Sequence, residues 1–86
     1  MTVQNRARVT LYTRPSCHLC DEAKREIDAA GCRDAYTLEE VDVDSDPTLK
    51  ARYGWEIPVV VIDGIVAFKY RLTADEFRRQ LRQIRR

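Results

Sequence analysis

The chain has 86 residues, of which 44% are hydrophobic and 34% are charged. This balance is typical of one globular domain and excludes a disordered chain. Fifteen Lys and Arg against fourteen Asp and Glu give a formal net charge of +1, so charge does not point to nucleic acid or an acidic membrane as partner. No apolar run approaches the roughly 20 residues that a membrane-spanning helix needs.

The cysteine content and the polar start of the chain suggest a cellular compartment. Met1 to Arg8 contain no hydrophobic segment of the kind found in signal peptides, so we expect a cytoplasmic protein. In that compartment three cysteines indicate a catalytic or metal-binding role rather than a disulfide scaffold. We expect residues 1–7 to form a flexible arm and residues 8–86 to form one domain.

Hydrophobic spacing and turn residues predict strands and helices in the order β-α-β-α-β-β-α. The expected elements are residues 8–13, 17–30, 36–44, 47–53, 57–62, 65–70 and a last helix from 74 onwards. Asp46-Pro47 starts the second helix, and Thr73 with Glu76 forms a capping box for the third. Asp63-Gly64 is a two-residue hairpin signal between the last two strands.

The first helix should bury one stripe of apolar side chains and end at a glycine. Its apolar positions follow helical spacing, namely Leu19, Ala23, Ile27 and Ala30. Gly31 stands where a left-handed residue closes a helix. The two strands joined through this helix should be parallel, with a right-handed crossover. Helices must cover both faces of the sheet, since the strand that ends at Ile62 carries no polar residue.

Cys17 and Cys20 form a Cys-x-x-Cys pair at the start of the first helix. Residues three apart lie on one face of a helix, about 5–6 Å between Cβ atoms, which suits a disulfide. Cys17 falls where unpaired amides and the helix dipole favour a thiolate. Arg14 and His18 could add positive charge, whereas the acidic residues that follow oppose it. We predict Cys17 as nucleophile and Cys20 as resolving cysteine.

Other roles for the cysteines are weaker. A zinc site needs four ligands, and Cys32 and His18 are the remaining candidates; His18 should project away from the face that the pair shares, so we expect no metal. Cys32 lies twelve residues beyond Cys20, on the order of 18 Å along a straight helix. It cannot resolve a mixed disulfide quickly and is interpreted as a bystander, with glutathionylation or an intermolecular disulfide left open.

Two residues near the third strand need a reason. Pro58 removes a ladder hydrogen bond from the most apolar strand, and the pattern leaves open a cis Ile57–Pro58 bond or a trans proline at the first strand position. Trp55, the single tryptophan, is interpreted as a loop anchor that packs on the edge of the core, with a binding platform as the alternative.

These motifs together resemble the glutaredoxin-like branch of the thioredoxin superfamily. The matching stretches run from Val9 to Cys-His-Leu-Cys20, then Tyr53-Gly54-x-x-Ile57-Pro58-Val59, then Asp63-Gly64. The resemblance covers nearly the whole chain from residue 8. It implies an α/β, thioredoxin-like fold with a four-stranded mixed sheet flanked by three helices. It also implies that Pro58 is cis and packs beside the cysteine pair.

The resemblance implies substrate contacts as well. The backbone of Ile57 would pair with an incoming peptide or glutathione, and Arg14 stands where glutaredoxins usually carry a lysine that meets the glutathione carboxylate. Glutaredoxins usually read Cys-Pro-Tyr-Cys, and a Gly-Gly-x-Asp-Asp segment before their last helix holds the glutamyl end of glutathione. Here the segment 70–75 has no glycine, and Asp75 is its one match. The predicted substrate-binding residues are therefore Arg14, His18, Ile57, Pro58 and Asp75.

We therefore predict a cytoplasmic, monomeric thiol–disulfide oxidoreductase without a bound cofactor. Its substrate would be a disulfide-containing protein or a small thiol. A reductase, glutathione or another low-molecular-weight thiol would then reduce the disulfide that forms between Cys17 and Cys20. Two alternatives stay open. One is a binding module on a thioredoxin fold whose cysteines do not turn over. The other is a metal or iron–sulfur cluster shared through Cys17 of two chains.

Overall fold

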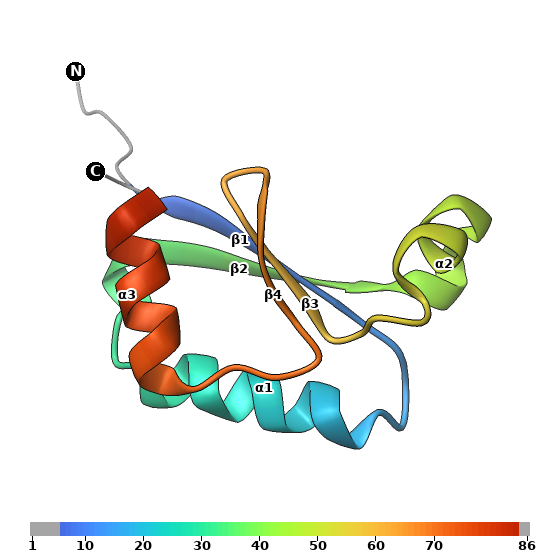
Figure 1. Cartoon of the computed structure of the whole chain (residues 1–86), viewed down its shortest axis with the longest axis horizontal. Coiled ribbons are helices and arrows are strands. Elements are labelled where there is room, and N and C mark those ends of the chain that lie inside the picture. Colours follow the sequence, from blue (N-terminus) through green and yellow to red (C-terminus); the bar gives the residue numbers. More distant parts are fainter. Residues whose placement is uncertain (1–5, 85–86) are drawn as a thin grey trace.

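The computed structural model describes residues 6–84, in which four strands and three helices follow the predicted order. The elements are β1 (Ala7–Thr13), α1 (His18–Ala29), β2 (Tyr36–Asp42), α2 (Pro47–Tyr53), β3 (Val59–Ile62), β4 (Ile65–Lys69) and α3 (Ala74–Ile84). Two short 3-10 turns at Arg33–Ala35 and Val43–Ser45 flank β2. Figure 1 shows the arrangement, which confirms the predicted thioredoxin-like α/β fold.

The sheet is mixed, with the strand order β2-β1-β3-β4. β1 pairs parallel with β2 and antiparallel with β3, and β3 pairs antiparallel with β4. Because β1 and β3 are adjacent and antiparallel, the C-terminal end of β1 lies beside the N-terminal end of β3. The segment that leads into α1 and the loop before β3 therefore meet at the same end of the central strands, although about forty residues separate them.

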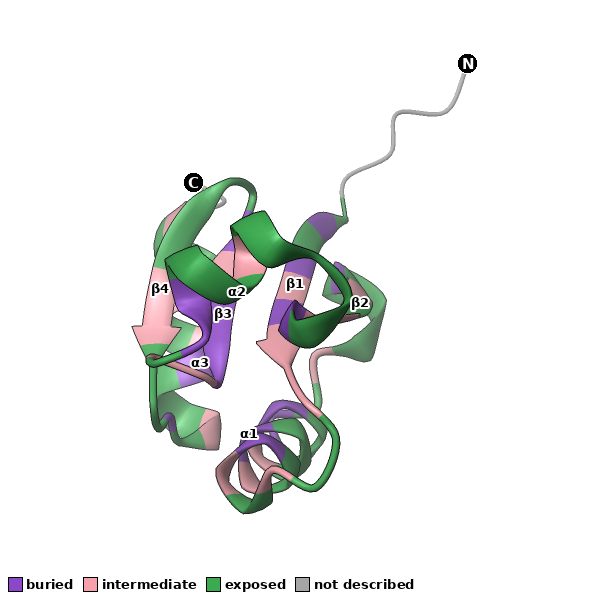
Figure 2. Cartoon of the chain, turned by 90° about the vertical axis from the view of Figure 1, so that its right-hand side faces the viewer, coloured by how far each residue is buried: buried purple, intermediate pink, exposed green. Residues whose placement is uncertain are grey.

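The two faces of the sheet carry two hydrophobic clusters. Neighbouring residues of a strand point to opposite faces, so Val60 and Val59 belong to different clusters. The larger cluster packs α1 and α3 on one face, around the fully buried Phe77. The smaller one places Tyr53 of α2 on the other face. Figures 1 and 2 show that α2 covers only one end of that face.

Several boundaries differ from the prediction for local reasons. β1 begins at Ala7, which is fully buried and belongs to the domain. Of the rest of the expected flexible arm, Arg6 is exposed and precedes the strand, and residues 1–5 lie outside the described residues. β2 ends at Asp42, whose carboxylate accepts the Asp44 amide and starts a turn. β4 ends before Tyr70, which has a φ of 70°. Within residues 6–84, no helix is long and apolar enough to cross a membrane.

The buried stripe of α1 differs from the prediction at its start. The stripe begins at Cys20, which is 3% exposed, and continues through Ala23 and Ile27. Leu19, which was expected to begin it, is only half-buried. Spacings of three and four fit both choices equally well, so periodicity alone did not separate them. Gly31 has the left-handed φ of 70° that was expected after the helix.

The start of α3 is capped from two directions. The predicted capping box is present: the Thr73 amide donates to Glu76 Oε1 at 3.0 Å, and the Glu76 amide donates to Thr73 Oγ1 at 3.2 Å. The Ala74 amide donates to Glu26 Oε1 of α1 at 2.9 Å. Arg78 in turn donates to the carbonyl of Ala30 at 2.9 Å. These contacts fix α3 against α1.

The contact between α1 and α3 can be tested at Glu26. We expect Glu26→Ala to lower the free energy of unfolding by about 1 kcal/mol, the usual cost of a lost helix cap. Glu26→Gln keeps an acceptor oxygen and should cost less. Urea denaturation measures both changes against Arg25→Ala, an exposed neighbour on the same helix. Equal stabilities for Glu26→Ala and Arg25→Ala would show that the contact does not stabilise the fold.

Candidate functional site

Cys17 and Cys20 are joined by a disulfide at the head of α1, with their Cα atoms 5.2 Å apart. Cys17 is the N-cap residue, and its Sγ accepts the Cys20 amide at 3.2 Å. Cys17 is half-buried, whereas Cys20 lies in the buried stripe at 3% exposure. The pair therefore has one sulfur that a substrate can approach and one that the core covers.

His18 lies between the two cysteines but points to solvent. Its side chain is 82% exposed, and Nε2 lies 2.8 Å from a carboxylate oxygen of Glu22, one turn along the helix. Any positive charge on His18 is thus held beside an acidic group. Within the described residues, no three His, Cys, Asp or Glu side chains gather in a way that could hold a metal ion.

Arg14 forms a clamp between three distant segments. Its Nε and Nη2 donate to the two carboxylate oxygens of Asp44 at 3.1 and 3.0 Å, and Nη1 donates to the Gly54 carbonyl at 3.2 Å. A Cβ on Gly54 would meet the Lys50 carbonyl and lie 3.3 Å from Arg14 Nη2, so only glycine fits there. Arg14 was predicted to meet a substrate carboxylate; the structure uses three of its five N–H groups inside the protein.

The clamp also changes the electrostatics of its acidic partner. The hydrogen bond and charge of Arg14 lower the pKa of Asp44, and the Asp44 carboxylate raises the pKa of Arg14. The sequence reasoning did not single out Asp44. The one signal was an Asp-x-Asp pattern, Asp42 and Asp44, just after the strand, which could not name Arg14 as its partner.

Pro58 and Ile57 lie at the same edge of the sheet as the segment that leads into α1. The Ile57–Pro58 peptide bond is cis in the structure, Pro58 is fully buried, and Ile57 is half-buried against the smaller cluster. The Pro58 carbonyl accepts the Tyr70 amide at 2.8 Å. This bond ties the start of β3 to the residue that follows β4.

Two other candidates lie differently from their expected roles. Trp55 is 91% exposed, so the interpretation as a loop anchor is wrong; the loop lifts the indole into solvent beside Arg14 and Lys50. Asp75 pairs with Arg78 on its own helix and is 74% exposed. Cys32 is half-buried against the larger core and donates to the Ala30 carbonyl at 3.5 Å.

The Arg14 clamp generates a pH-dependent prediction. Because the folded state lowers the pKa of Asp44, its charged form stabilises the fold above the unfolded value of about 3.9, and this stabilisation is lost as the pH falls through the folded pKa. We expect Asp44→Asn to be less stable than the wild type at pH 7, with a difference that vanishes in acid.

Urea denaturation across a pH series measures that difference. Asp34→Asn, a change at an exposed carboxylate in the first 3-10 turn, is the matched control and should leave stability unchanged throughout. A difference between Asp44→Asn and the wild type that is the same at every pH would contradict the assignment.

Comparisons with known proteins agree with this site. Residues 8–82 match the model of the glutaredoxin-like domain family (DUF836). The chain is 32% identical over 84 residues to "Glutaredoxin-like protein YDR286C homolog" of Dictyostelium discoideum, covering 91% of this chain and 78% of that protein. It is 33% identical over 67 residues to a thioredoxin of Methanocaldococcus jannaschii, covering 74% and 79%.

A solved structure extends the likeness to three dimensions. Target protein XcR50 from X. campestris superimposes with a TM-score of 0.72 at 28% identity, covering 87% of this chain and 96% of that one. The family match includes the cysteine pair, Pro58 and the hairpin. The chain therefore belongs to the glutaredoxin-like domain family, within the thioredoxin superfamily.

Proposed function

We propose that the protein is a thiol–disulfide oxidoreductase that cycles Cys17 and Cys20 between dithiol and disulfide. The observation that carries the proposal is the pair at the head of α1, at disulfide distance, with one sulfur half-buried and the other in the core. Membership of a glutaredoxin-like family and likeness to a thioredoxin support the same chemistry.

In the proposed cycle, the Cys17 thiolate attacks one sulfur of a substrate disulfide. The substrate S–S bond breaks, its second sulfur leaves with the bonding electron pair and takes up a proton, and a mixed disulfide forms on Cys17. Cys20 then loses its proton and attacks Cys17 Sγ, which releases the first substrate sulfur as a thiolate. The substrate gains two electrons, and the protein is left as the disulfide present in the structure.

The start of α1 supports the choice of Cys17 as nucleophile. The Cys20 amide already donates to Cys17 Sγ, and a helix N-terminus stabilises negative charge. Asp21 in the first turn acts against this effect. Cys20 needs a mixed disulfide one turn away to react, because the core covers it.

The substrate and the electron donor follow by the same reasoning. We propose a disulfide-containing protein or a small thiol as substrate, and a reductase or a low-molecular-weight thiol, glutathione included, as donor. The protein would act as a cytoplasmic monomer. Arg14 keeps two N–H groups beyond its three internal bonds, so it can still meet a substrate carboxylate.

Replacing each cysteine separates the two steps. We expect Cys17→Ser to abolish reduction of a peptide disulfide, since the remaining Cys20 thiol is covered by the core and cannot reach the substrate. We expect Cys20→Ser to accumulate a mixed disulfide on Cys17, seen as a mass increase equal to the bound thiol less two hydrogen atoms. Cys32→Ser is the control and should keep wild-type turnover, because that thiol packs on the core. Full activity of Cys17→Ser would disprove the mechanism.

One observation favours a second function, a binding module whose cysteines do not turn over. An indole that is 91% exposed is available for a partner protein, and tryptophan is a frequent anchor of interfaces. In that case a variant with both Cys17 and Cys20 replaced by Ser would still bind its partner and rescue a deletion strain.

The exposed Trp55 can be tested as a docking residue for a protein substrate. For an oxidoreductase that uses Trp55 to dock its substrate, we expect Trp55→Ala to raise KM for a protein disulfide about fivefold, the equivalent of about 1 kcal/mol. The kcat of the variant and its free energy of unfolding should equal those of the wild type, because the Trp55 side chain contacts little of the protein. Reduction of a small disulfide is the internal control. A loss of kcat with both substrates would argue against a docking role.

A further inference from the structure

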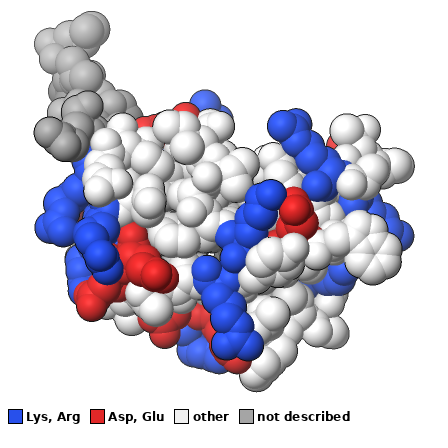
Figure 3. Space-filling view, viewed as in Figure 1, with Lys and Arg blue, Asp and Glu red and all other residues white. Residues whose placement is uncertain are grey.

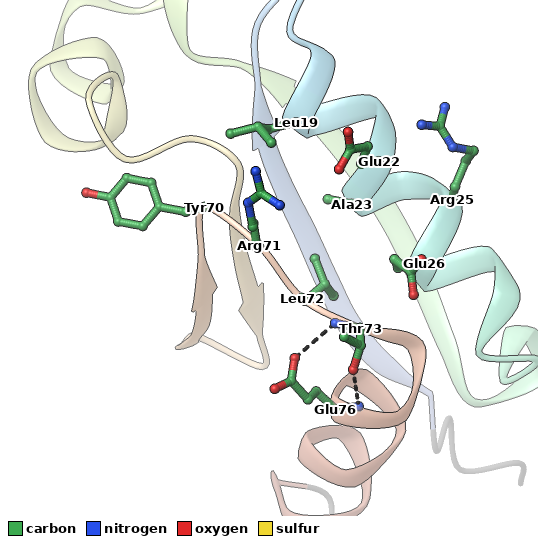
Figure 4. Close-up of a pocket in the computed structure, with 10 residues that line it drawn as sticks. All are labelled: Leu19, Glu22, Ala23, Arg25, Glu26, Tyr70, Arg71, Leu72, Thr73 and Glu76. Atoms are coloured by element: carbon green, nitrogen blue, oxygen red, sulfur yellow. Dashed lines mark hydrogen bonds between the residues drawn. The ribbon is translucent and has the colours of Figure 1, made fainter.

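A cleft of about 560 Å³ lies between α1 and the connection from β4 to α3. Figure 4 shows the side chains that line it, which come from residues 19–26 on one wall and 70–76 on the other. The cleft begins close to the redox pair in the chain, because Leu19 directly precedes Cys20 and Tyr70 is hydrogen-bonded to the Pro58 carbonyl. It is large enough for part of a substrate.

The acidic groups of the cleft already have partners inside the protein. Glu26 accepts the Ala74 amide, Glu76 accepts the Thr73 amide, and Glu22 contacts His18. Glu26 and Glu76 therefore cap the start of α3, at the end of the cleft that is farther from the cysteines. Glu22 lies along the surface of α1.

The arginine at the other end is different. Within residues 6–84, Arg71 has no ion pair and no side-chain hydrogen bond. Figure 4 shows its guanidinium projecting toward the first turn of α1, near Leu19, whereas Arg25 extends away from the cleft. Arg71 therefore offers its guanidinium donors to a ligand at the Leu19 end of the cleft. A guanidinium suits a carboxylate, which it can bind with two parallel hydrogen bonds.

The backbone holds Arg71 in this place. Tyr70 has a φ of 70°, an uncommon conformation for a bulky residue. Its amide is bonded to Pro58, and the next residue but one, Leu72, is buried in the larger core. Arg71 therefore lies between two fixed residues. Figure 3 shows Lys and Arg interspersed with Asp and Glu over the face that it views, so positive charge does not form one continuous patch there.

The length of the cleft favours a peptide as its occupant. Leu19 and Glu26 are seven residues apart on α1, which is about 10 Å at the helical rise of 1.5 Å per residue. An extended chain covers about 3.3 Å per residue, so the cleft has room for about three residues. The half-buried Leu19 can pack against an aliphatic side-chain stem while Arg71 binds an acidic group.

We propose that this cleft binds the segment next to the disulfide of a protein substrate, and that Arg71 selects an acidic residue there. This inference rests on the proposed oxidoreductase function and names its substrate class: disulfides flanked by Asp or Glu. Arg71 would act as a specificity-determining residue, because it changes which disulfide is brought to Cys17 and not the chemistry of the sulfur atoms.

The test compares the rates at which the reduced protein reduces three peptide disulfides. The peptides are identical except for two positions next to one cysteine, which are Glu, Gln or Lys. Acid-quenched samples followed by mass spectrometry give the second-order rate constants. We expect the wild type to prefer Glu over Gln by about fivefold, as for an exposed ion pair, with Lys slowest. This preference should shrink as salt is added.

Variants then locate the preference. Arg71→Glu should reverse the order, making the Lys peptide the fastest, and Arg71→Gln should leave the three rates equal. Arg82→Glu, a change of the same charge at an exposed site on α3 away from the cleft, should keep the wild-type order. The rate on the Gln peptide should be the same in all four proteins, which shows that each is folded and reactive.

The outcomes separate this proposal from the function on which it rests. If the wild type reduces no peptide, the oxidoreductase function fails. If it reduces all three equally, or prefers Lys, and Arg71→Glu changes nothing, the function stands and the cleft proposal is wrong. A small disulfide that carries carboxylates is a further arm. If Arg71→Glu slows that compound but not the Glu peptide, the occupant is a small thiol and the peptide proposal is overturned.

Discussion

The position of the redox pair depends on one guanidinium. Arg14 joins the segment before α1 to Asp44 after β2 and to Gly54 after α2, through three hydrogen bonds that cross thirty to forty residues of sequence. None of the three residues lies in a strand of the sheet, so strand pairing alone does not place them. The clamp brings the helix that carries Cys17 and the loop before Pro58 to one edge of the sheet, where the strand order already directs them.

The unequal exposure of the two cysteines follows from where α1 begins. With Cys17 as N-cap, Cys20 falls on the stripe that packs against the sheet, and the same turn leaves Leu19 at its edge. Burial of Cys20 Sγ and access to Cys17 Sγ thus have a single cause. The shift of one position also makes Leu19 part of the cleft, so packing of the helix and recognition of a substrate are coupled.

Most of the fold could be predicted because its signals are local. The capping box at Thr73, the Asp63-Gly64 hairpin and the glycine after α1 each need only a few neighbouring residues. The cysteine pair is equally local, since three residues of helix set its spacing. The errors came where a short pattern allows two solutions, as at Leu19 and Cys20, or where a loop decides, as at Trp55.

The sequence by itself determined the order of the elements, the family and the cysteine pair that lies at disulfide distance, because propensity, capping and spacing act over one or two turns of chain. Only the tertiary structure decided how the charged residues are used. Arg14 has hydrogen-bond partners inside the protein, whereas the Arg71 side chain, beside Leu19, meets no partner among residues 6–84. Such roles depend on contacts between residues thirty or more positions apart, and composition and spacing do not record which partner a charge meets.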